Sequence, residues 1–216
     1  MIIVAGGTGQ RMQSEIPKQF LEISGIPILM HTLRVFHEMD IDINIILVIP
    51  EAHIRTWKIL CEEHAFKLPH HTAFGGNTRF QSVKNGLNHV QEGSLIAIHD
   101  GVRPLVSQEV IRNAFHIAGK FGTAVPAIPV NESMRIKEND GNKTLNRKLV
   151  RIIQTPQVFK YSIIKKAYQQ TYHESFTDDA MVVEATGQKV RLTEGNIENI
   201  KITRKIDLKI AEALIG

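Results

Sequence analysis

The segment from Ala5 to Phe20, AGGTGQRMQSEIPKQF, places three glycines, an arginine and a lysine directly after a short apolar run. Glycines let backbone amides come close to a bound group, and oriented amides attract anions. Arg11 and Lys18 would add two full positive charges. Phosphoryl and nucleotidyl transfer depend mainly on such positioning and charge stabilisation. We therefore expect this loop to bind a nucleoside triphosphate.

Two other glycine-loop chemistries do not fit this segment. A phosphate-binding loop of the nucleotide triphosphatase kind ends in Gly-Lys-Ser/Thr, which is absent here. A dinucleotide fingerprint counted from Gly7 requires glycine where Met12 stands, and no convincing acidic residue follows about 20 residues later. A glycine-rich turn with incidental basic residues remains the alternative to a phosphate site.

The composition indicates one globular domain in a reducing compartment. A chain of 216 residues with 43% apolar and 22% charged residues can bury a large core, which excludes a disordered protein. Cys61 is the only cysteine, so an internal disulfide is excluded. No apolar stretch resembles a signal peptide or a membrane span. The sequence predicts a cytoplasmic protein that does not bind membranes.

The charge pattern argues against nucleic acid as a partner. The net charge is +4, but the basic residues are scattered and aromatic residues make up only 6% of the chain. A platform on which bases could stack is therefore poorly supported. A site for a small polyanion explains the basic residues better.

Apolar runs that fit buried strands alternate with segments of helical periodicity. The expected strands are Met1–Val4, Asn44–Ile49, Leu95–His99 and Thr123–Ile128. The expected helices are Pro27–Asp40, Glu51–His64, Thr78–Val90 (with Asn77 as its cap) and Gln108–Phe121. This alternation predicts an α/β, Rossmann-like fold over 1–216, in which helices cover both faces of a mainly parallel, twisted sheet.

In such a sheet, ligands bind beyond the carboxyl ends of the strands. Three loops follow expected strand ends, namely Ala5–Lys18, Gly75–Thr78 and Asp100–Ser107. We expect these loops to converge on one cleft.

The polar segment from Pro129 to Ile153 interrupts the alternation. It contains the turn signal Asp140-Gly141, which predicts a long hairpin or arm. Since its few apolar residues cannot form a core, we expect this arm, 129–153, to pack on a second subunit of a homodimer. A solvated excursion is the alternative.

Seven segments occur in the order and approximate spacing of one known family. They are AGGTGQRM, PKQFL, GGNTRFQSVKNGL, HDGVRP, QTPQVF, FTDDA and ENIKIT. On these segments the chain resembles the 2-C-methyl-D-erythritol 4-phosphate cytidylyltransferases of the non-mevalonate isoprenoid pathway. The resemblance implies that CTP and methylerythritol 4-phosphate give the CDP-alcohol and pyrophosphate, with a divalent cation, usually magnesium. The substrate phosphate would attack the α-phosphorus in line, without a catalytic base.

The resemblance also implies roles for individual residues on the nucleotide side. Arg11 and Lys18 would stabilise the transition state. The residues that would bind CTP are Ala5, Gly6, Gly7, Gly76, Arg79, Ser82, Asp100 and Arg103. Among them, Gly76, Arg79 and Ser82 would recognise the cytosine and ribose, and Arg103 would face the phosphates. Asp100 would hold the magnesium ion, unless it serves as a helix cap or pairs with Arg103.

On the side of the sugar phosphate, the resemblance implies two further catalytic residues, Arg147 on the arm and Lys201. Lys201 lies just inside an expected late apolar strand. The residues that would bind the acceptor are Ser133, Arg135, Thr155, Thr177 and Asp178. The chain departs from the common family pattern at Gly101, Val102, Glu132, Ser133 and Asn146.

Two other functions remain open at this point. A related cytidylyltransferase of the same fold transfers CMP to ribitol 5-phosphate, and the opening loop suits both enzymes. The segments GGNTRFQSVKNGL and PAIPV favour the isoprenoid enzyme. A nucleotide sensor without activity would gain nothing from groups that favour only the transition state, such as Lys18 and Arg147.

Overall fold

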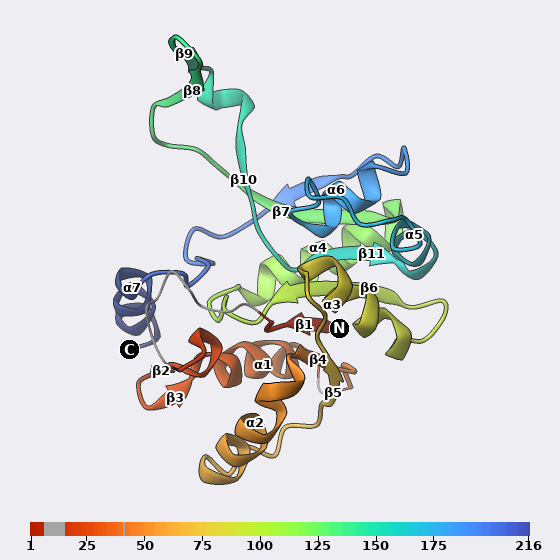
Figure 1. The fold of residues 1–216 in the computed structure, drawn as a ribbon, viewed down its shortest axis with the longest axis vertical. Helices are drawn as coiled ribbons and strands as arrows, with labels where there is room; N and C mark the ends of the chain where they lie inside the picture. Colours follow the sequence, from red (N-terminus) through yellow and green to blue (C-terminus); the bar gives the residue numbers. More distant parts are fainter. Residues whose placement is uncertain (7–15, 41) are drawn as a thin grey trace.

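The computed structural model describes residues 1–6, 16–40 and 42–216, so Gly7 and Arg11 lie outside the described residues. Its centre is an eight-stranded sheet in the order β10-β7-β11-β6-β1-β4-β5, with β12 beside β7 (Figure 1). The strands are β1 (Ile2–Val4), β4 (Ile46–Ile49), β5 (His71–Phe74), β6 (Leu95–Asp100), β7 (Thr123–Pro129), β10 (Arg151–Ile153), β11 (Gln157–Lys160) and β12 (Leu192–Glu194).

The sheet is mainly parallel, as the sequence predicts. The pairs β1/β4, β1/β6, β4/β5 and β7/β12 are parallel. Strand β11 was not predicted, and it lies antiparallel between β6 and β7. Because β11 pairs with both, β6 and β7 point the same way although they do not pair with each other.

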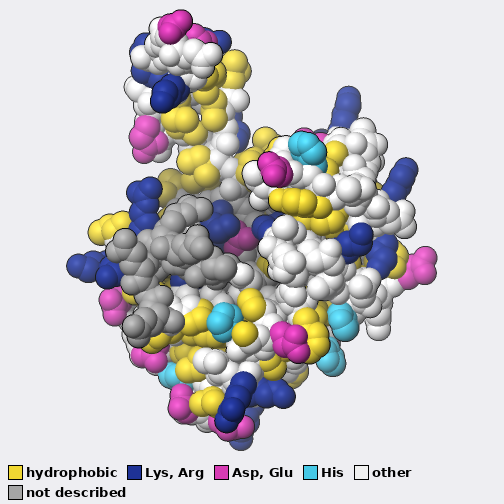
Figure 2. Space-filling model, viewed as in Figure 1, with side chains coloured by type: hydrophobic (Ala, Val, Ile, Leu, Met, Phe, Trp, Pro, Cys, Tyr) yellow, Lys and Arg dark blue, Asp and Glu magenta, His cyan; other side chains and the backbone are white. Residues whose placement is uncertain are grey.

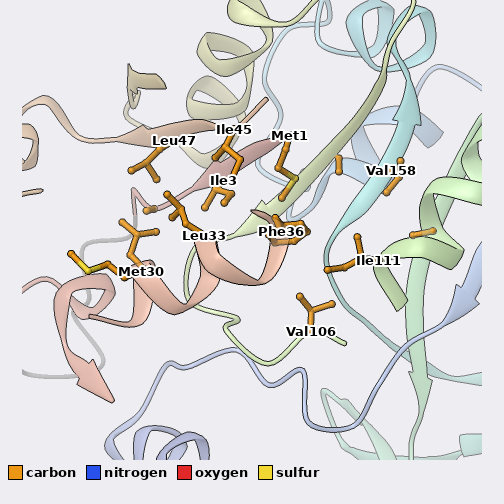
Figure 3. Packing of buried hydrophobic residues seen from close by; sticks show 14 of the residues in the cluster. Met1, Ile3, Met30, Leu33, Phe36, Ile45, Leu47, Val106, Ile111 and Val158 are labelled. Carbon is orange, nitrogen blue, oxygen red and sulfur yellow. The ribbon is translucent and has the colours of Figure 1, made fainter. Parts of the chain in front are cut away.

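Helices cover both faces of the sheet, which confirms the predicted fold class. One face packs against α1 (Ile28–Met39), α2 (Glu51–Glu63) and α4 (Gln108–Phe121). The other face packs against α3 (Arg79–Gly86), α5 (Tyr161–Ala167) and α6 (Asp179–Glu184). Successive strand residues serve opposite layers, since Ile3 belongs to the first core and Ile2 to the second. Figure 3 shows Leu33 and Phe36 of α1 packed near Ile3.

Local signals in the sequence account for the helix ends near the site. Helix α4 begins after Ser107, whose hydroxyl accepts a hydrogen bond from the Val110 amide at 3.2 Å. It ends at Gly122, which adopts φ +92°. The cap of α3 is Thr78 rather than the expected Asn77, because the Thr78 hydroxyl accepts from the Gln81 amide at 3.0 Å. The expected helix Thr78–Val90 ends as a 3-10 turn, η3 (Leu87–His89).

The C-terminal helix α7 (Lys205–Ile215) closes a small third core beside the sheet. Its Ala211 packs with Ile23 and Ile202, near the short strands β2 (Glu22–Ile23) and β3 (Ile26–Pro27). The expected late strand around Lys201 is wrong, since this segment is irregular and Ile202 is tied down by one backbone bond to Val102. Of the helices in the described part, none is long and apolar enough to cross a membrane.

The polar segment after β7 forms the predicted hairpin. Strands β8 (Met134–Glu138) and β9 (Gly141–Leu145) pair antiparallel, and a 3-10 turn, η4 (Arg147–Leu149), leads back to the sheet at β10. The hairpin stands away from the body in Figure 1. It carries hydrophobic side chains in Figure 2, and the side chain of Leu149 is 82% exposed. That the hairpin mediates dimerisation stays a prediction.

Candidate active site

A pocket of about 300 Å³ opens at the carboxyl ends of β1 and β6. It is lined by Val4, Ala5, Gly6, Lys18, Gln19, Gly76, Asn77, Thr78, Arg79, Ser82, Asp100, Val102 and Lys201. The three loops expected to converge all contribute to it. Apart from Gly7, which lies outside the described residues, and Arg103, the residues predicted to bind CTP meet in this pocket. Lys18, predicted to stabilise the transition state, lines it too, whereas Arg11 lies outside the described residues. We refer to this pocket as the nucleotide pocket.

The turn between β5 and α3 forms one wall of the nucleotide pocket. The Gly76 amide donates a hydrogen bond to the Ser82 hydroxyl at 3.0 Å, and that hydroxyl donates to the Thr78 carbonyl at 2.9 Å. A Cβ atom on residue 76 would lie 2.5 Å from the Cβ of Gln81. Any larger side chain at Gly76 would therefore displace the start of α3.

Asp100, the last residue of β6, faces three cations. Its Oδ2 lies 3.0 Å from Lys201 Nζ and 3.2 Å from Arg103 Nε, and its Oδ1 lies 3.6 Å from Arg79 Nε. Burial by itself would raise the pKa of Asp100, but the charges of Lys201, Arg79 and Arg103 outweigh it. The pKa is held well below its usual value, so this carboxylate is ionised.

Thr155 and His99 bind the backbone of Asp100 and Arg103 through hydrogen bonds. The Thr155 hydroxyl accepts from the Asp100 amide at 3.1 Å and bonds His99 Nδ1 at 3.0 Å. Since the Arg103 carbonyl can only accept, His99 Nε2 carries the proton and donates to it at 3.0 Å. Burial lowers the pKa of His99 to about 4, which keeps the ring neutral. The Arg103 guanidinium donates to the Asn199 carbonyl at 2.7 Å, near Lys201.

A second pocket of about 410 Å³ adjoins the first. It is lined by Arg79, Asp100, Arg103, Val125, Ile153, Gln154, Thr155, Gln157, Thr177, Asp178, Ala180, Met181, Glu184, Val190, Leu192 and Lys201. We refer to it as the acceptor pocket, because the predicted acceptor residues of the body meet here. Asp178 caps α6 by accepting from the Met181 amide at 2.9 Å, and Gln157 donates to its other oxygen at 3.0 Å.

The predicted residues of the hairpin lie elsewhere. Ser133, Arg135 and Arg147 line neither of the two pockets of their own chain. The Arg147 guanidinium donates to the Asn131 carbonyl, and Arg135 binds Asn142 and Thr144 across the hairpin. Within one chain, Arg135 and Arg147 are therefore occupied by contacts of the arm itself.

Arg79, Asp100 and Lys201 line both pockets and form the partition between them. Two terminal nitrogens of Arg79 donate to the buried Asp179, at 2.8 and 2.6 Å. Asp179, which binds this shared residue, was not among the residues predicted from the sequence. The available signal was the second carboxylate of FTDDA, but nothing local connects it to an arginine 100 residues away.

A cation that arrives with a nucleotide needs few ligands from the protein. Among residues 1–6, 16–40 and 42–216, no three His, Cys, Asp or Glu side chains gather as a metal site. Mg²⁺ in nucleotide sites is commonly held by one or two carboxylates together with substrate phosphates. Asp100 is an ionised carboxylate that lines both pockets, but Lys201 and Arg103 lie 3.0 and 3.2 Å from its Oδ2, so a bound cation would have to displace at least one of these contacts.

A pocket lined by Lys18, Arg79 and Lys201 at the carboxyl edge of a mainly parallel α/β sheet, with a second pocket that shares part of its lining, suits an enzyme of the nucleotidyltransferase class. The family model for 2-C-methyl-D-erythritol 4-phosphate cytidylyltransferase matches residues 1–216. The chain belongs to this family.

Individual relatives agree over the full length. The 2-C-methyl-D-erythritol 4-phosphate cytidylyltransferase of Bacteroides thetaiotaomicron is 51% identical, over 100% of this chain and 98% of the relative. The enzyme of that name from Bacteroides fragilis is 52% identical, over 99% and 98%. The crystal structure of 4-diphosphocytidyl-2C-methyl-D-erythritol synthase from Anaerococcus prevotii has a TM-score of 0.83 at 30% identity, over 99% of this chain and 94% of that one.

Proposed function

We propose that the two pockets divide the substrates of one reaction, with CTP in the nucleotide pocket and the sugar phosphate in the acceptor pocket. As a member of its family, the chain transfers CMP from CTP to 2-C-methyl-D-erythritol 4-phosphate and releases pyrophosphate. The observation that carries the division is the shared partition of Arg79, Asp100 and Lys201. The α-phosphorus of CTP would lie at this partition, where the two substrates meet.

The chemistry needs cations rather than a base. An oxygen of the acceptor phosphate attacks the α-phosphorus, a new P–O bond forms, and the bond to the β-phosphate breaks. The nucleophile is already an anion, so no proton has to be removed. Negative charge grows on the α-phosphoryl oxygens and the leaving pyrophosphate, and fixed cations stabilise it. We assign this role to Lys18 and Lys201, because Lys18 lines the nucleotide pocket and Lys201 lines both pockets.

Asp100 would hold a divalent cation that accompanies CTP, directly or through water. When bound, such a cation neutralises phosphate charge and polarises the α-phosphoryl group. The chain's own contribution is the orientation of Asp100, which Thr155 holds through the backbone amide of residue 100.

The hairpin would complete the site of a second subunit in a homodimer. Arg147 and its neighbours line neither pocket of their own chain, and exposed apolar groups on the hairpin, such as Leu149, have nothing to cover them within it. The body supplies Thr155, Thr177 and Asp178 to the acceptor. The sole cysteine, Cys61, supports a cytoplasmic location.

The acceptor is tested by pyrophosphate release from CTP and Mg²⁺ with each sugar phosphate offered separately. We expect turnover with methylerythritol 4-phosphate and little with ribitol 5-phosphate. Faster turnover with ribitol 5-phosphate would assign the acceptor pocket to the related wall-polymer enzyme. Binding of CTP without turnover on either acceptor would instead indicate a nucleotide sensor.

The same assay with other nucleotides tests the nucleotide pocket. We expect CTP to exceed ATP and GTP by about 10²-fold or more in kcat/KM, because a base that lies against Gly76 and Ser82 would leave little room for a purine. UTP is the harder discrimination, since it differs only at the exocyclic amine and one ring nitrogen. Equal turnover of ATP and CTP would contradict this assignment of the pocket.

Lys201→Ala is expected to raise the KM for the sugar phosphate and to lower kcat, with CTP affinity nearly intact. Losing one charged contact to a phosphate corresponds to about 10- to 100-fold in kcat/KM. Steady-state kinetics and CTP titration calorimetry measure both effects. Lys209→Ala, an exposed lysine of α7 outside both pockets, is the matched control. If CTP affinity fell by the same factor as kcat/KM for the sugar phosphate, Lys201 would be assigned to the binding of the CTP triphosphate.

A further inference from the structure

Asp179, the first residue of α6, is a completely buried carboxylate behind the partition. Its Oδ1 accepts from Arg79 at 2.8 Å and its Oδ2 at 2.6 Å. The hydroxyl of Tyr168 donates a third hydrogen bond to Oδ1 at 2.6 Å. A carboxylate removed from water keeps its charge only where such partners replace the water. The position of Asp179 is therefore defined by Arg79 and Tyr168 together.

We propose that Asp179 is a positioning residue for CMP transfer, which holds Arg79 at the partition between the nucleotide pocket and the acceptor pocket. Arg79 is the first residue of α3, which follows the turn of the nucleotide pocket. Asp179 follows Thr177 and Asp178, which line the acceptor pocket. The ion pair thus joins the two substrate sides. The proposal rests on the function proposed above.

The surroundings fix the plane of the guanidinium as well as its place. Phe80, next to Arg79, stacks on the Tyr168 ring with centroids 4.7 Å apart and planes at 22°. The chain of contacts Arg79, Asp179, Tyr168 and Phe80 therefore closes on itself. An arginine carries five N–H groups in one plane. With two of them bound to Asp179, the plane cannot rotate unless those bonds break.

The charge of Arg79 is permanent in this setting. Burial by itself would lower the pKa of Arg79, but Asp179 and then Asp100 raise it well above its usual value. Without Asp179, Arg79 would keep the Asp100 carboxylate, whose Oδ1 lies 3.6 Å from Arg79 Nε. The guanidinium would then be drawn toward Asp100 and would compete there with Lys201.

Stability alone is a weak explanation for this ion pair. A buried pair can often be replaced by apolar side chains of similar volume without loss of stability. The Arg79–Asp179 pair lies at the partition, where we propose that the reacting phosphorus binds. Its role would be to keep the Arg79 guanidinium in one position, since a cation that acts on this phosphorus must be held closely. A displacement of about 1 Å in such a group can cost about 10² in rate.

The test begins with Asp179→Asn, which keeps the size of the side chain and removes its charge. At saturating CTP and methylerythritol phosphate with Mg²⁺, we expect kcat to fall by about 10²-fold. The CTP dissociation constant from calorimetry should change little. Tyr168→Phe removes one of the three hydrogen bonds and should lower kcat in the same direction, by less.

The same substitution in an Arg79→Lys variant distinguishes a positioning role of Asp179 from a role in folding. Arg79→Lys keeps a positive charge beside Asp179 but cannot form the two-point contact. If Asp179 acts through Arg79, adding Asp179→Asn to Arg79→Lys should lower kcat little further. Ser107→Ala, which removes the cap of α4 outside both pockets, is the control for destabilisation. It should lower the Tm and leave kcat unchanged.

Two results would overturn the proposal while the function stands. One is an Asp179→Asn variant that has a lower Tm and unchanged kcat. The other is the same loss of kcat from Asp179→Asn in both backgrounds, which would make the residue structural. If the unaltered protein released no pyrophosphate with methylerythritol phosphate, the proposed function and the positioning role would both be wrong.

Discussion

Lys18→Ala should lower turnover by about 10²–10³-fold and weaken CTP binding far less. Lys18 begins a 3-10 turn, η2 (Lys18–Phe20), and lines the nucleotide pocket. The turn is anchored from below, because Phe20 is buried and stacks on Trp57 with centroids 6.2 Å apart. A cation on a fixed turn interacts most strongly with the transition state, when negative charge builds around the α-phosphorus. Such an interaction raises kcat rather than the affinity for CTP.

The effect of Lys18 is measured by single-turnover kinetics at saturating substrates together with CTP calorimetry. Lys58→Ala is the matched control, because Lys58 is an exposed lysine of α2 that lines neither pocket. Its removal changes the net charge equally and should leave kcat unchanged. Normal turnover of Lys18→Ala with weakened CTP affinity would assign Lys18 to binding of the ground state.

The helices and the parallel strands could be predicted because their signals are local. Ser107 and Gly122 mark both ends of α4 in the sequence, and the apolar run of β6 ends at Asp100. Strand β11 could not be predicted in the same way. It spans only Gln157–Lys160, and it becomes a strand by lying between β6 and β7. Such pairing depends on the assembled sheet rather than on the four residues.

The nucleotide side of the site could be predicted because strand order brings loop ends together. Once β1, β4, β5 and β6 lie side by side, Gly6, Gly76 and Asp100 must share one edge. The late strand expected around Lys201 is absent, although ENIKIT is apolar at Ile200 and Ile202. In the structure, Ile202 fills a core beside α7 and the backbone stays irregular.

The hydrogen-bond partners of the site residues could not be predicted from the sequence. Arg79 was expected to read the base and ribose, yet two of its terminal N–H groups bind Asp179. Arg103 was expected on the phosphate side, yet it lines the acceptor pocket and holds the Asn199 carbonyl. Both contacts join segments about 100 residues apart. No periodicity or spacing in one sequence encodes them.

The hairpin carries Arg147 away from both pockets of its own chain. We expect a homodimer in which Arg147 of one subunit enters the active site of the other. The hairpin leaves the sheet at β7 and returns at β10, and Arg147 lines neither pocket of its own chain. Leu149 beside it is 82% exposed, and Ile136 and Ile152 of the same excursion are exposed as well, so the hairpin offers several apolar groups to a partner. Lys18→Ala and Arg147→Ala should each be inactive as homodimers.

Mixing these two variants and letting the subunits reassort should restore activity. In a mixed dimer with exchanged hairpins, one site carries both defects and the other carries none. With random pairing, roughly half of the dimers are mixed, so roughly a quarter of all sites should recover. If Arg147 acts within its own chain, every site keeps one defect and nothing recovers. Subunit exchange is confirmed separately with two affinity tags. Persistent inactivity in a pool that has exchanged would show that Arg147 does not serve the partner's site.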